Sequence, residues 1–257
     1  MPARTRATSG GTAASGEPRY TTRRTVEGGS GSDDTGRRYR STSAVPGSVG
    51  AMAAPEQYFT EQPQVPSAPS SVALALPDLH LRLTTDRGVF SGSRVDPGTH
   101  YLLLEAPMPP ADTTATFLDL GCGYGPIALT LASRAPRATV WAVDVNERAR
   151  DLTETNARQL GLANVRVAHP DEVPADLTLD GIYANPPIRV GNAALDAMLR
   201  RWLRHLTPTG RAHLVIGRNL GADSIARRLR ADGWHVERLG SRAGYRILTV
   251  HGAEVAA

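Results

Sequence analysis

A glycine-rich loop, Gly121-Cys122-Gly123-Tyr124-Gly125, joins an apolar segment to a helical pattern near the middle of the 257-residue chain. The segment 116–120 has the length and composition of a buried strand. Pro126 suits the first turn of the helix predicted over 126–134, where its missing N–H would have no partner anyway. Glycines at a strand-to-helix turn permit positive φ and let a ligand approach the backbone closely. The loop therefore predicts a nucleotide-like ligand site at the edge of a parallel sheet.

Strand and helix patterns alternate along the chain after this loop. We predict strands at 116–120, 139–143, 165–168, 179–184, 211–216, 235–239 and 245–250, and helices at 98–105, 126–134, 146–160, 192–206 and 224–230. This alternation indicates an α/β fold: a doubly wound, Rossmann-like, mostly parallel seven-stranded sheet with helices on both faces. No helix separates the last two strands, so we expect them to form an antiparallel pair at the C-terminal edge.

Three regions differ in composition. Residues 1–51 are rich in Arg, Gly, Ser and Thr, and we predict that they are disordered because they cannot bury enough apolar surface. Alternatively, Met52 is the true start of the protein. Residues 52–110 form a Pro-rich and β-rich lead-in, with a small hairpin predicted over 72–76 and 79–84. Residues 111–257 hold the glycine loop and the alternating pattern.

Composition excludes several classes of protein. The chain has no apolar run long enough for a transmembrane helix, and we predict no contact with a membrane. The single cysteine, Cys122, rules out an internal disulfide and fits a reducing compartment such as the cytoplasm. We interpret it as a small loop residue rather than a nucleophile. The seven histidines show no metal-ligand spacing along the sequence, so we predict no metal site.

The net positive charge belongs to the N-terminal region. Residues 1–51 contain eight arginines and four acidic residues, whereas residues 52–257 contain 21 of each. Charge therefore gives little support to nucleic-acid binding by the predicted α/β domain.

Acidic residues follow the predicted strands around the glycine loop. Asp144 ends the second strand of the sheet, where a carboxylate can accept bonds from both hydroxyls of a ribose; the alternative is a helix N-cap. Asp119 is expected to orient the glycine loop or a cationic ligand group. Pro126 stands where the dinucleotide fingerprint needs glycine, which argues against a nicotinamide cofactor. S-adenosylmethionine (SAM) carries a sulfonium and an ammonium group, so it suits these acids better than a pyrophosphate does. The predicted cofactor-binding residues are Asp119, Gly121, Gly123, Gly125, Asp144 and Asp171, the last either meeting the adenine amino group or serving as an ordinary turn residue.

The strand 179–184 ends in Asn185-Pro186-Pro187-Ile188, at the carboxyl edge where ligands bind in open α/β sheets. The two prolines stiffen the turn and fix the directions of the Asn185 side chain and the Pro186 carbonyl. An exocyclic amine on a nucleobase is a poor nucleophile because its lone pair is delocalised into the ring. Two aimed acceptors favour its pyramidal, nucleophilic state. We therefore predict that this tetrapeptide is catalytic; the alternative is a Pro-rich loop in which Asn185 only caps the turn.

Over residues 56–250 these motifs resemble the class I SAM-dependent methyltransferases, in particular the RsmC-like 16S rRNA (guanine-N2)-methyltransferase family. The shared parts are Gly88-Val89-Phe90-Ser91, Asp96-Pro97-Gly98-Thr99, the glycine loop, Asp144 and Asn185-Pro186-Pro187. The resemblance implies that residues 111–257 are a methyltransferase domain with SAM as cofactor. It implies that Asn185 and Pro186 hold the target amine, that the glycine loop and Asp144 hold SAM, and that the segment around Phe90 closes over the cofactor. The expected substrate is guanine N2 in rRNA, on an assembled or nearly assembled small ribosomal subunit.

The chain departs from this family at two points. The tetrapeptide ends in Ile188, where relatives usually carry a Phe or Tyr that stacks on the flipped base, an interaction worth roughly 1–3 kcal/mol. The chain also resembles a single catalytic domain, without the second domain of longer relatives. We predict that Phe90 contributes to substrate binding and that Arg189, Arg242 and Arg246 contact phosphate.

Other functions fit the same motifs. A release-factor-type enzyme that methylates a protein glutamine at N5 could use the same turn, and so could a small-molecule N-methyltransferase. An inactive SAM-binding partner protein is disfavoured because both Asn185 and Asp144 are present.

Overall fold

The computed structural model describes residues 65–91 and 93–252. The predicted disordered segment 1–51, the alternative start at Met52 and the beginning of the lead-in lie outside these residues. Within the described part of the chain, no helix is both long enough and apolar enough to span a membrane.

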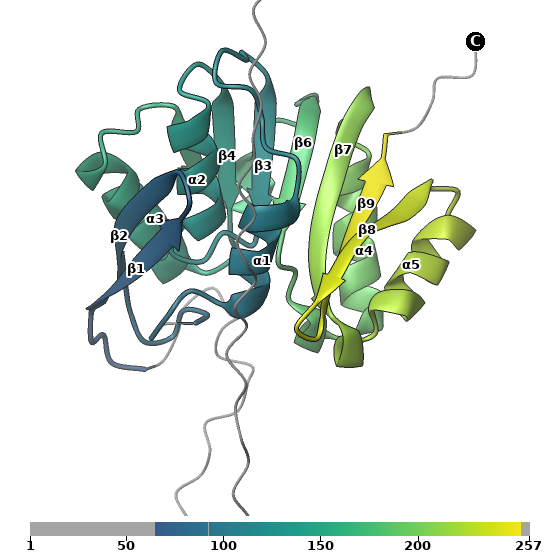
Figure 1. Ribbon diagram of the computed structural model, residues 1–257, viewed down its shortest axis with the longest axis horizontal. Helices are drawn as coiled ribbons and strands as arrows, with labels where there is room; N and C mark the ends of the chain where they lie inside the picture. Colours follow the sequence, from purple (N-terminus) through teal and green to yellow (C-terminus); the bar gives the residue numbers. More distant parts are fainter. Residues whose placement is uncertain (1–64, 92, 253–257) are drawn as a thin grey trace, which may run out of the picture. The chain divides into compact units, whose positions relative to one another are not determined.

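A seven-stranded sheet forms the centre of the described structure, with the strand order β5-β4-β3-β6-β7-β9-β8 (Figure 1). The strands from β5 to β7 in this order are parallel, and β9 is antiparallel to both of its neighbours. This confirms the predicted sheet with its antiparallel C-terminal edge. The strands are β3 (Thr116–Leu120), β4 (Thr139–Val143), β5 (Val165–Ala168), β6 (Leu179–Ala184), β7 (Leu206–Gly217), β8 (Val236–Arg242) and β9 (Tyr245–His251).

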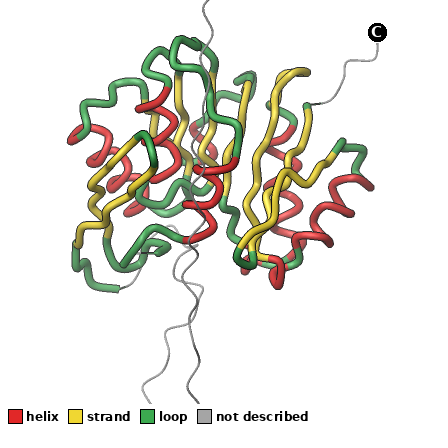
Figure 2. Tube along the Cα trace, in the orientation of Figure 1, coloured by secondary structure: helices red, strands yellow, loops and turns green. Residues whose placement is uncertain are grey.

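Helices and strands alternate along the chain (Figure 2), and the sheet is apolar on both faces. Phe117 and Tyr183 point into one core, whereas their neighbours Leu118 and Ile182 point into the other, as the alternation of side chains along a strand requires. The first core is covered by α1 (Pro97–Glu105), α2 (Pro126–Arg134) and α3 (Glu147–Gln159), and the second by α4 (Asn192–Leu203) and α5 (Ala222–Ala231). The sheet is therefore doubly wound, as predicted.

A separate hairpin, β1 (Ser70–Leu76) and β2 (Leu79–Thr85), confirms the predicted β-rich lead-in. Alternate residues on both strands are buried and join the first core. Asn156 of α3 fixes the hairpin through two bonds with the backbone of Thr84, at 2.7 and 2.9 Å, and also donates to the Tyr124 carbonyl at 2.9 Å. The hairpin is thus tied to the back of the glycine loop.

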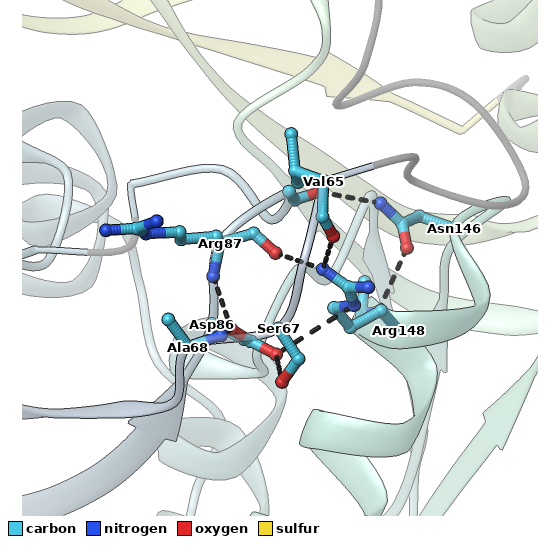
Figure 3. A network of polar contacts seen from close by, with 9 residues as sticks. Val65, Ser67, Ala68, Asp86, Arg87, Asn146 and Arg148 are labelled. Atoms are coloured by element: carbon cyan, nitrogen blue, oxygen red, sulfur yellow. Dashed lines mark hydrogen bonds and ion pairs between the residues drawn. The ribbon is translucent and has the colours of Figure 1, made fainter.

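A polar network anchors the segments on either side of the hairpin (Figure 3). Asp86 accepts bonds from the Ser67 hydroxyl at 2.6 Å and from the Ala68 and Arg87 N–H groups at 2.5 and 2.7 Å. Burial opposes the charge of Asp86, but these bonds outweigh it and hold the pKa of the carboxyl below its usual value. Arg148 of α3 donates to the Val65 and Arg87 carbonyls at 3.0 and 2.7 Å. The network fixes the start of the loop that carries Val89 and Phe90.

Candidate active site

A cavity of about 730 Å³ opens where β3, β4 and β6 end. Ligand cavities of this kind typically have volumes of about 300–1,000 Å³, and the carboxyl edge of a doubly wound sheet is their usual place. Its walls come from the loop after β2, the glycine loop, the segment after β4, the tetrapeptide after β6 and one side of α4. Among the predicted site residues, the lining includes Phe90, Gly121, Gly123, Asp144, Asn185, Pro186, Pro187, Ile188 and Arg189.

The backbone of the glycine loop is held against the end of β4. The N–H groups of Gly121 and Cys122 both donate to the Val143 carbonyl, at 2.8 and 3.1 Å. Gly121 and Gly123 have φ values of 78° and 58°, which L side chains rarely adopt. A Cβ added at Gly121 would meet no atom within 4 Å, so the space beside this backbone is open to a ligand.

Asp144 links the glycine loop to the segment after β4. Its Oδ2 accepts from the Gly123 N–H and its Oδ1 from the Asn146 N–H, both at 2.9 Å. Burial raises the pKa of this carboxyl, although the backbone bonds act in the opposite direction. The N-cap of α3 is Asn146, whose side chain accepts from the Ala149 N–H at 3.2 Å. The alternative in which Asp144 caps this helix is therefore wrong.

Asn146 also connects this carboxylate to the wall of the cavity that carries Phe90. Its Nδ2 donates to the Gly88 carbonyl at 3.0 Å, and the side chain is buried. Val89 and Phe90 follow Gly88 directly and line the cavity. Phe90 is 46% exposed, which is unusual for an aromatic side chain and places it at the cavity rim.

Asp119 lies behind the glycine loop and does not line the cavity. It is fully buried, and its Oδ2 accepts from the Ala128 N–H in the first turn of α2 at 2.9 Å. Its Oδ1 has no hydrogen-bond partner within the described residues. Burial raises the pKa of this carboxyl to about 8. In this arrangement Asp119 orients the helix that follows the glycine loop.

The raised pKa of Asp119 predicts a pH dependence of stability. Between the ordinary value of 3.8 and about 8, the folded protein binds a proton that the unfolded chain does not. The free energy of unfolding should therefore fall as pH rises through this window. The fall is at most about 1.4 kcal/mol for each unit by which the pKa of Asp119 in the folded protein exceeds its pKa in the unfolded chain. Asp119→Asn keeps an acceptor for the Ala128 N–H and removes the titration, so its free energy of unfolding should change less between about pH 5 and pH 8.

Urea unfolding of both proteins at several pH values across this window measures the difference. Asp112→Asn, which removes an exposed aspartate, serves as the control variant. Parallel profiles for the wild type and Asp119→Asn would show that Asp119 does not titrate in this range.

The Asn185 side chain is held in place at the cavity by two hydrogen bonds. Its Nδ2 donates to the Asp96 Oδ2 at 2.8 Å and to the Thr99 hydroxyl at 3.0 Å, so both amide hydrogens are used. Asp96 is itself fixed as the N-cap of α1, where the same Oδ2 accepts from the Thr99 N–H at 3.0 Å. Within the described residues, the side-chain oxygen of Asn185, Oδ1, makes no hydrogen bond. The amide therefore presents an acceptor and no donor.

The rest of the tetrapeptide forms one wall of the cavity. The Pro187 carbonyl accepts from the Val190 N–H at 3.2 Å, which closes a tight turn after the prolines. Ile188 is half-buried and packs against the second core while also lining the cavity. Its neighbour Arg189 is exposed at the rim and has no acidic partner among the described residues.

The three other predicted contact residues lie outside the cavity lining. Asp171 is exposed and pairs with Arg201 of α4 at 2.8 Å, which lowers the pKa of its carboxyl. Arg242 pairs with Glu105 at 3.8 Å, and Arg246 pairs with Asp223. Each of them is thus engaged with an opposite charge of the protein itself, and their proposed contacts with adenine or phosphate stay predictions. Gly125, also outside the lining, is the left-handed N-cap of α2.

Cys122 lacks the properties of a nucleophile. Its thiol is buried, and burial raises its pKa well above the usual value, with the charges of Asp144 and Asp119 acting in the same direction. The thiol therefore stays protonated.

Two parts of the site were not predicted from the sequence. Asp96 and Thr99 hold the Asn185 amide, and Tyr245 at the start of β9 lines the cavity beside Phe90 and Asn185. The Tyr245 ring lies so close to Gly98 that a Cβ there would meet it at 2.6 Å. The Asp96-Pro97 pair, an N-cap signal, marks the start of α1 but not its contact with β6.

Comparisons with known proteins agree with this geometry. The family model "Methyltransferase small domain" matches residues 80–249. The uncharacterized protein YbxB of Bacillus subtilis (strain 168) is 35% identical over 196 residues, covering 75% of this chain and 96% of that protein. Ribosomal RNA large subunit methyltransferase G of Shewanella amazonensis is 33% identical over 60% of this chain and 42% of its own.

A solved structure is similar over most of the chain. It is the 16S rRNA N2 G1207 methyltransferase (RsmC) of T. Thermophilus in complex with AdoMet and guanosine, with a TM-score of 0.64 and 25% identity. The alignment covers 74% of this chain and 52% of that one. The chain thus spans about half the length of these two rRNA methyltransferases.

Proposed function

The chain belongs to the methyltransferase small domain family and is an RsmC-like class I SAM-dependent methyltransferase, and from this premise we propose that it methylates the exocyclic N2 of a guanine in small-subunit rRNA. One observation carries the proposal: the Asn185 amide is locked by Asp96 and Thr99 so that only its oxygen is offered to the cavity. An amide held in this way selects a partner that donates hydrogen bonds, as an amino group does.

The residues around the glycine loop fit SAM. The open space beside Gly121 admits a ligand to the backbone, and the Asp144 carboxylate faces the same cavity. Each Asp144 oxygen accepts one backbone N–H, from Gly123 or from Asn146, and keeps a second lone pair. Both oxygens can therefore still accept hydrogen bonds from the ribose hydroxyls. The exposed Val145 supplies an apolar surface next to it. When bound, SAM supplies the electrophilic methyl group.

The tetrapeptide acts on the target amine. The Asn185 oxygen and the Pro186 carbonyl accept the two N–H bonds, which draws the nitrogen lone pair out of the ring and stabilises the charge that develops as nitrogen becomes tetrahedral. An amide is not a base, and none is required, because the nitrogen proton becomes acidic once the fourth bond forms. Asp96 and Thr99 keep the amide from rotating and from offering its NH₂ group to the substrate.

The rim of the cavity favours a nucleotide as the substrate, and the solved relative favours guanine as its base. Phe90 is exposed beside the tetrapeptide and offers the aromatic surface that Ile188 lacks, and base–aromatic stacking contributes roughly 1–3 kcal/mol. Arg189 has no acidic partner among the described residues and lines the same cavity, so it is available to pair with a phosphate of the substrate. The solved relative is a 16S rRNA N2 G1207 methyltransferase in complex with AdoMet and guanosine.

Asp96 is predicted to act through Asn185. Asp96→Ser keeps a side-chain oxygen that can cap α1 but is too short to reach Asn185, so the amide should become free to rotate. We expect kcat to fall by roughly 10- to 100-fold, with the dissociation constant of SAM unchanged, because a misplaced catalytic group costs rate rather than cofactor affinity.

Asp96→Asn retains an oxygen acceptor for both bonds and should restore most of this activity. Steady-state kinetics and SAM titrations of the two variants, with circular dichroism as the folding control, separate the roles. Equal losses of kcat in Asp96→Ser and Asp96→Asn would show that the charge of Asp96, rather than its hold on Asn185, is what matters.

The proposed substrate is tested by incubating the protein with methyl-labelled SAM and separate pools of small ribosomal subunits, large ribosomal subunits, free rRNA, release factor and a small-molecule extract. We expect label in the small-subunit RNA. Label only in the large subunit would contradict the assignment to small-subunit rRNA, and label only in release factor or in small molecules would contradict RNA as the substrate.

A further inference from the structure

Three side chains with metal-binding atoms meet at the opposite end of the sheet from the active-site cavity. His235 directly precedes β8, Glu237 lies on β8 and His251 ends β9. Tyr245, which lines the cavity, begins β9, and the strand between Tyr245 and His251 spans roughly 20 Å. Figure 1 shows β9 running away from the β8–β9 turn toward this end. The cluster is therefore separate from the methyl-transfer site.

Strand pairing brings the three residues together. The His251 N–H donates to the His235 carbonyl at 3.0 Å, so the two histidines are cross-strand neighbours, and Glu237 follows His235 by two residues on the same side of β8. Val236 and Val250 are buried in the core beneath α5. The alternation of side chains then directs His235, Glu237 and His251 to the other face of the sheet.

The ligand atoms converge on one point. The His235 Nε2 lies 2.9 Å from the Glu237 Oε1, the His251 Nε2 lies 3.5 Å from the Oε2 of the same carboxylate, and the three ligand atoms all fall within 4.8 Å of one another. Metal bonds of about 2.0–2.2 Å in a tetrahedral site separate neighbouring donors by about 3.3–3.5 Å. A small movement of the exposed His235 side chain completes that spacing.

The His251 nitrogen provides a second, independent indication. Its Nε2 is a buried atom and makes no hydrogen bond within the described residues, since the Glu237 oxygen lies at ion-pair rather than hydrogen-bond geometry. A buried nitrogen that lacks a hydrogen bond is energetically unfavourable. A metal ion between the histidines and the carboxylate would occupy this lone pair.

We propose that His235, Glu237 and His251 form a binding site for a divalent transition metal, with zinc as the best match. Two imidazoles and one carboxylate are a common zinc ligand set, and they leave a fourth position for water. The ion would add a link between the edge strand β8 and the end of β9, beside the backbone pairing, the contact of the His235 and His251 rings and the ion pair of His251 with Glu237. Because the cluster is remote from the cavity, the ion would take no part in methyl transfer.

The site is tested on full-length protein without a histidine tag and freed of metal with a chelator. Zinc titration by calorimetry should show saturable binding of one ion per chain, and the melting temperature should rise with zinc concentration. Cobalt(II) bound instead of zinc should give the intense visible absorption of a tetrahedral complex. His235→Ala and Glu237→Gln should each weaken zinc binding by roughly 10-fold or more.

His80→Ala removes an exposed histidine on β2 and serves as the matched control, which should bind zinc like the wild type. Glu237→Gln keeps the shape of the side chain, and its circular dichroism spectrum checks that a loss of binding does not come from misfolding. Two results would overturn the proposal: no saturable zinc binding by the wild type, or equal binding by the wild type and the double variant His235→Ala, Glu237→Gln.

Discussion

Replacing Asn185 with alanine is expected to lower kcat for methyl transfer by roughly 100- to 1,000-fold while the affinity for SAM stays within about threefold of the wild type. The substitution removes the acceptor that binds the amine most strongly in its tetrahedral state. It leaves the glycine loop and Asp144 untouched, because within the described part of the chain the Asn185 side chain makes its hydrogen bonds with Asp96 and Thr99. Single-turnover kinetics and calorimetric SAM titration measure the two effects separately.

Asn192 provides the control for this substitution. It is an exposed asparagine at the start of α4, a short distance along the chain from the tetrapeptide. Asn192→Ala should have the kcat and the SAM affinity of the wild type. A loss of SAM binding in Asn185→Ala as large as its loss of kcat would contradict the role of Asn185, since it would place this residue in the cofactor site.

Replacing Asp144 with alanine is expected to have the opposite pattern, with SAM affinity reduced by at least about 100-fold. The carboxylate holds the Gly123 N–H and the Asn146 N–H, and it is the proposed partner of the ribose hydroxyls. The two proposed hydrogen bonds from the ribose hydroxyls to this charged group would contribute about 1.5–3 kcal/mol each. A loss of about 2.7 kcal/mol corresponds to about 100-fold in affinity. The kcat at saturating SAM should change much less.

Asp151→Ala is the matched control, because Asp151 is an exposed aspartate on the neighbouring helix α3. Calorimetric titration of SAM into both variants, with thermal melts to confirm folding, measures the difference. A dissociation constant for Asp144→Ala within about threefold of the wild type would show that this carboxylate only shapes the loop.

Local sequence patterns predicted the fold well where an element is defined by its own residues. The bounds of β3, β4, β5, β6 and α2 agree with prediction, because each is a short apolar segment between strong turn residues. The helix predicted over 192–206 is too long: α4 ends at Leu203, and Leu206 begins β7. Leu206 fits the apolar side of the helix, but it pairs with Leu179 across the sheet, a contact that no local pattern contains.

The site likewise contains parts that the sequence predicts and contacts that it does not. The glycine loop, Asp144 and the tetrapeptide are contiguous motifs, and the structure brings them to one cavity. The contact between Asp96 and Asn185 joins residues 89 positions apart, so only the folded chain reveals it. The pairing of Asp171 with Arg201 likewise depends on how α4 packs, and no local sequence pattern contains it.

The measurement that tests the central claim most directly is the identity of the methylated product. Small ribosomal subunits lacking their natural modifications are incubated with the protein and labelled SAM, and the RNA is digested to nucleosides for mass spectrometry. Methyl transfer to an exocyclic amine at the Asn185 site predicts labelled N2-methylguanosine, and no label with Asn185→Ala. A label on a ring nitrogen, a ring carbon or a ribose hydroxyl, or an equal yield from Asn185→Ala, would contradict the account.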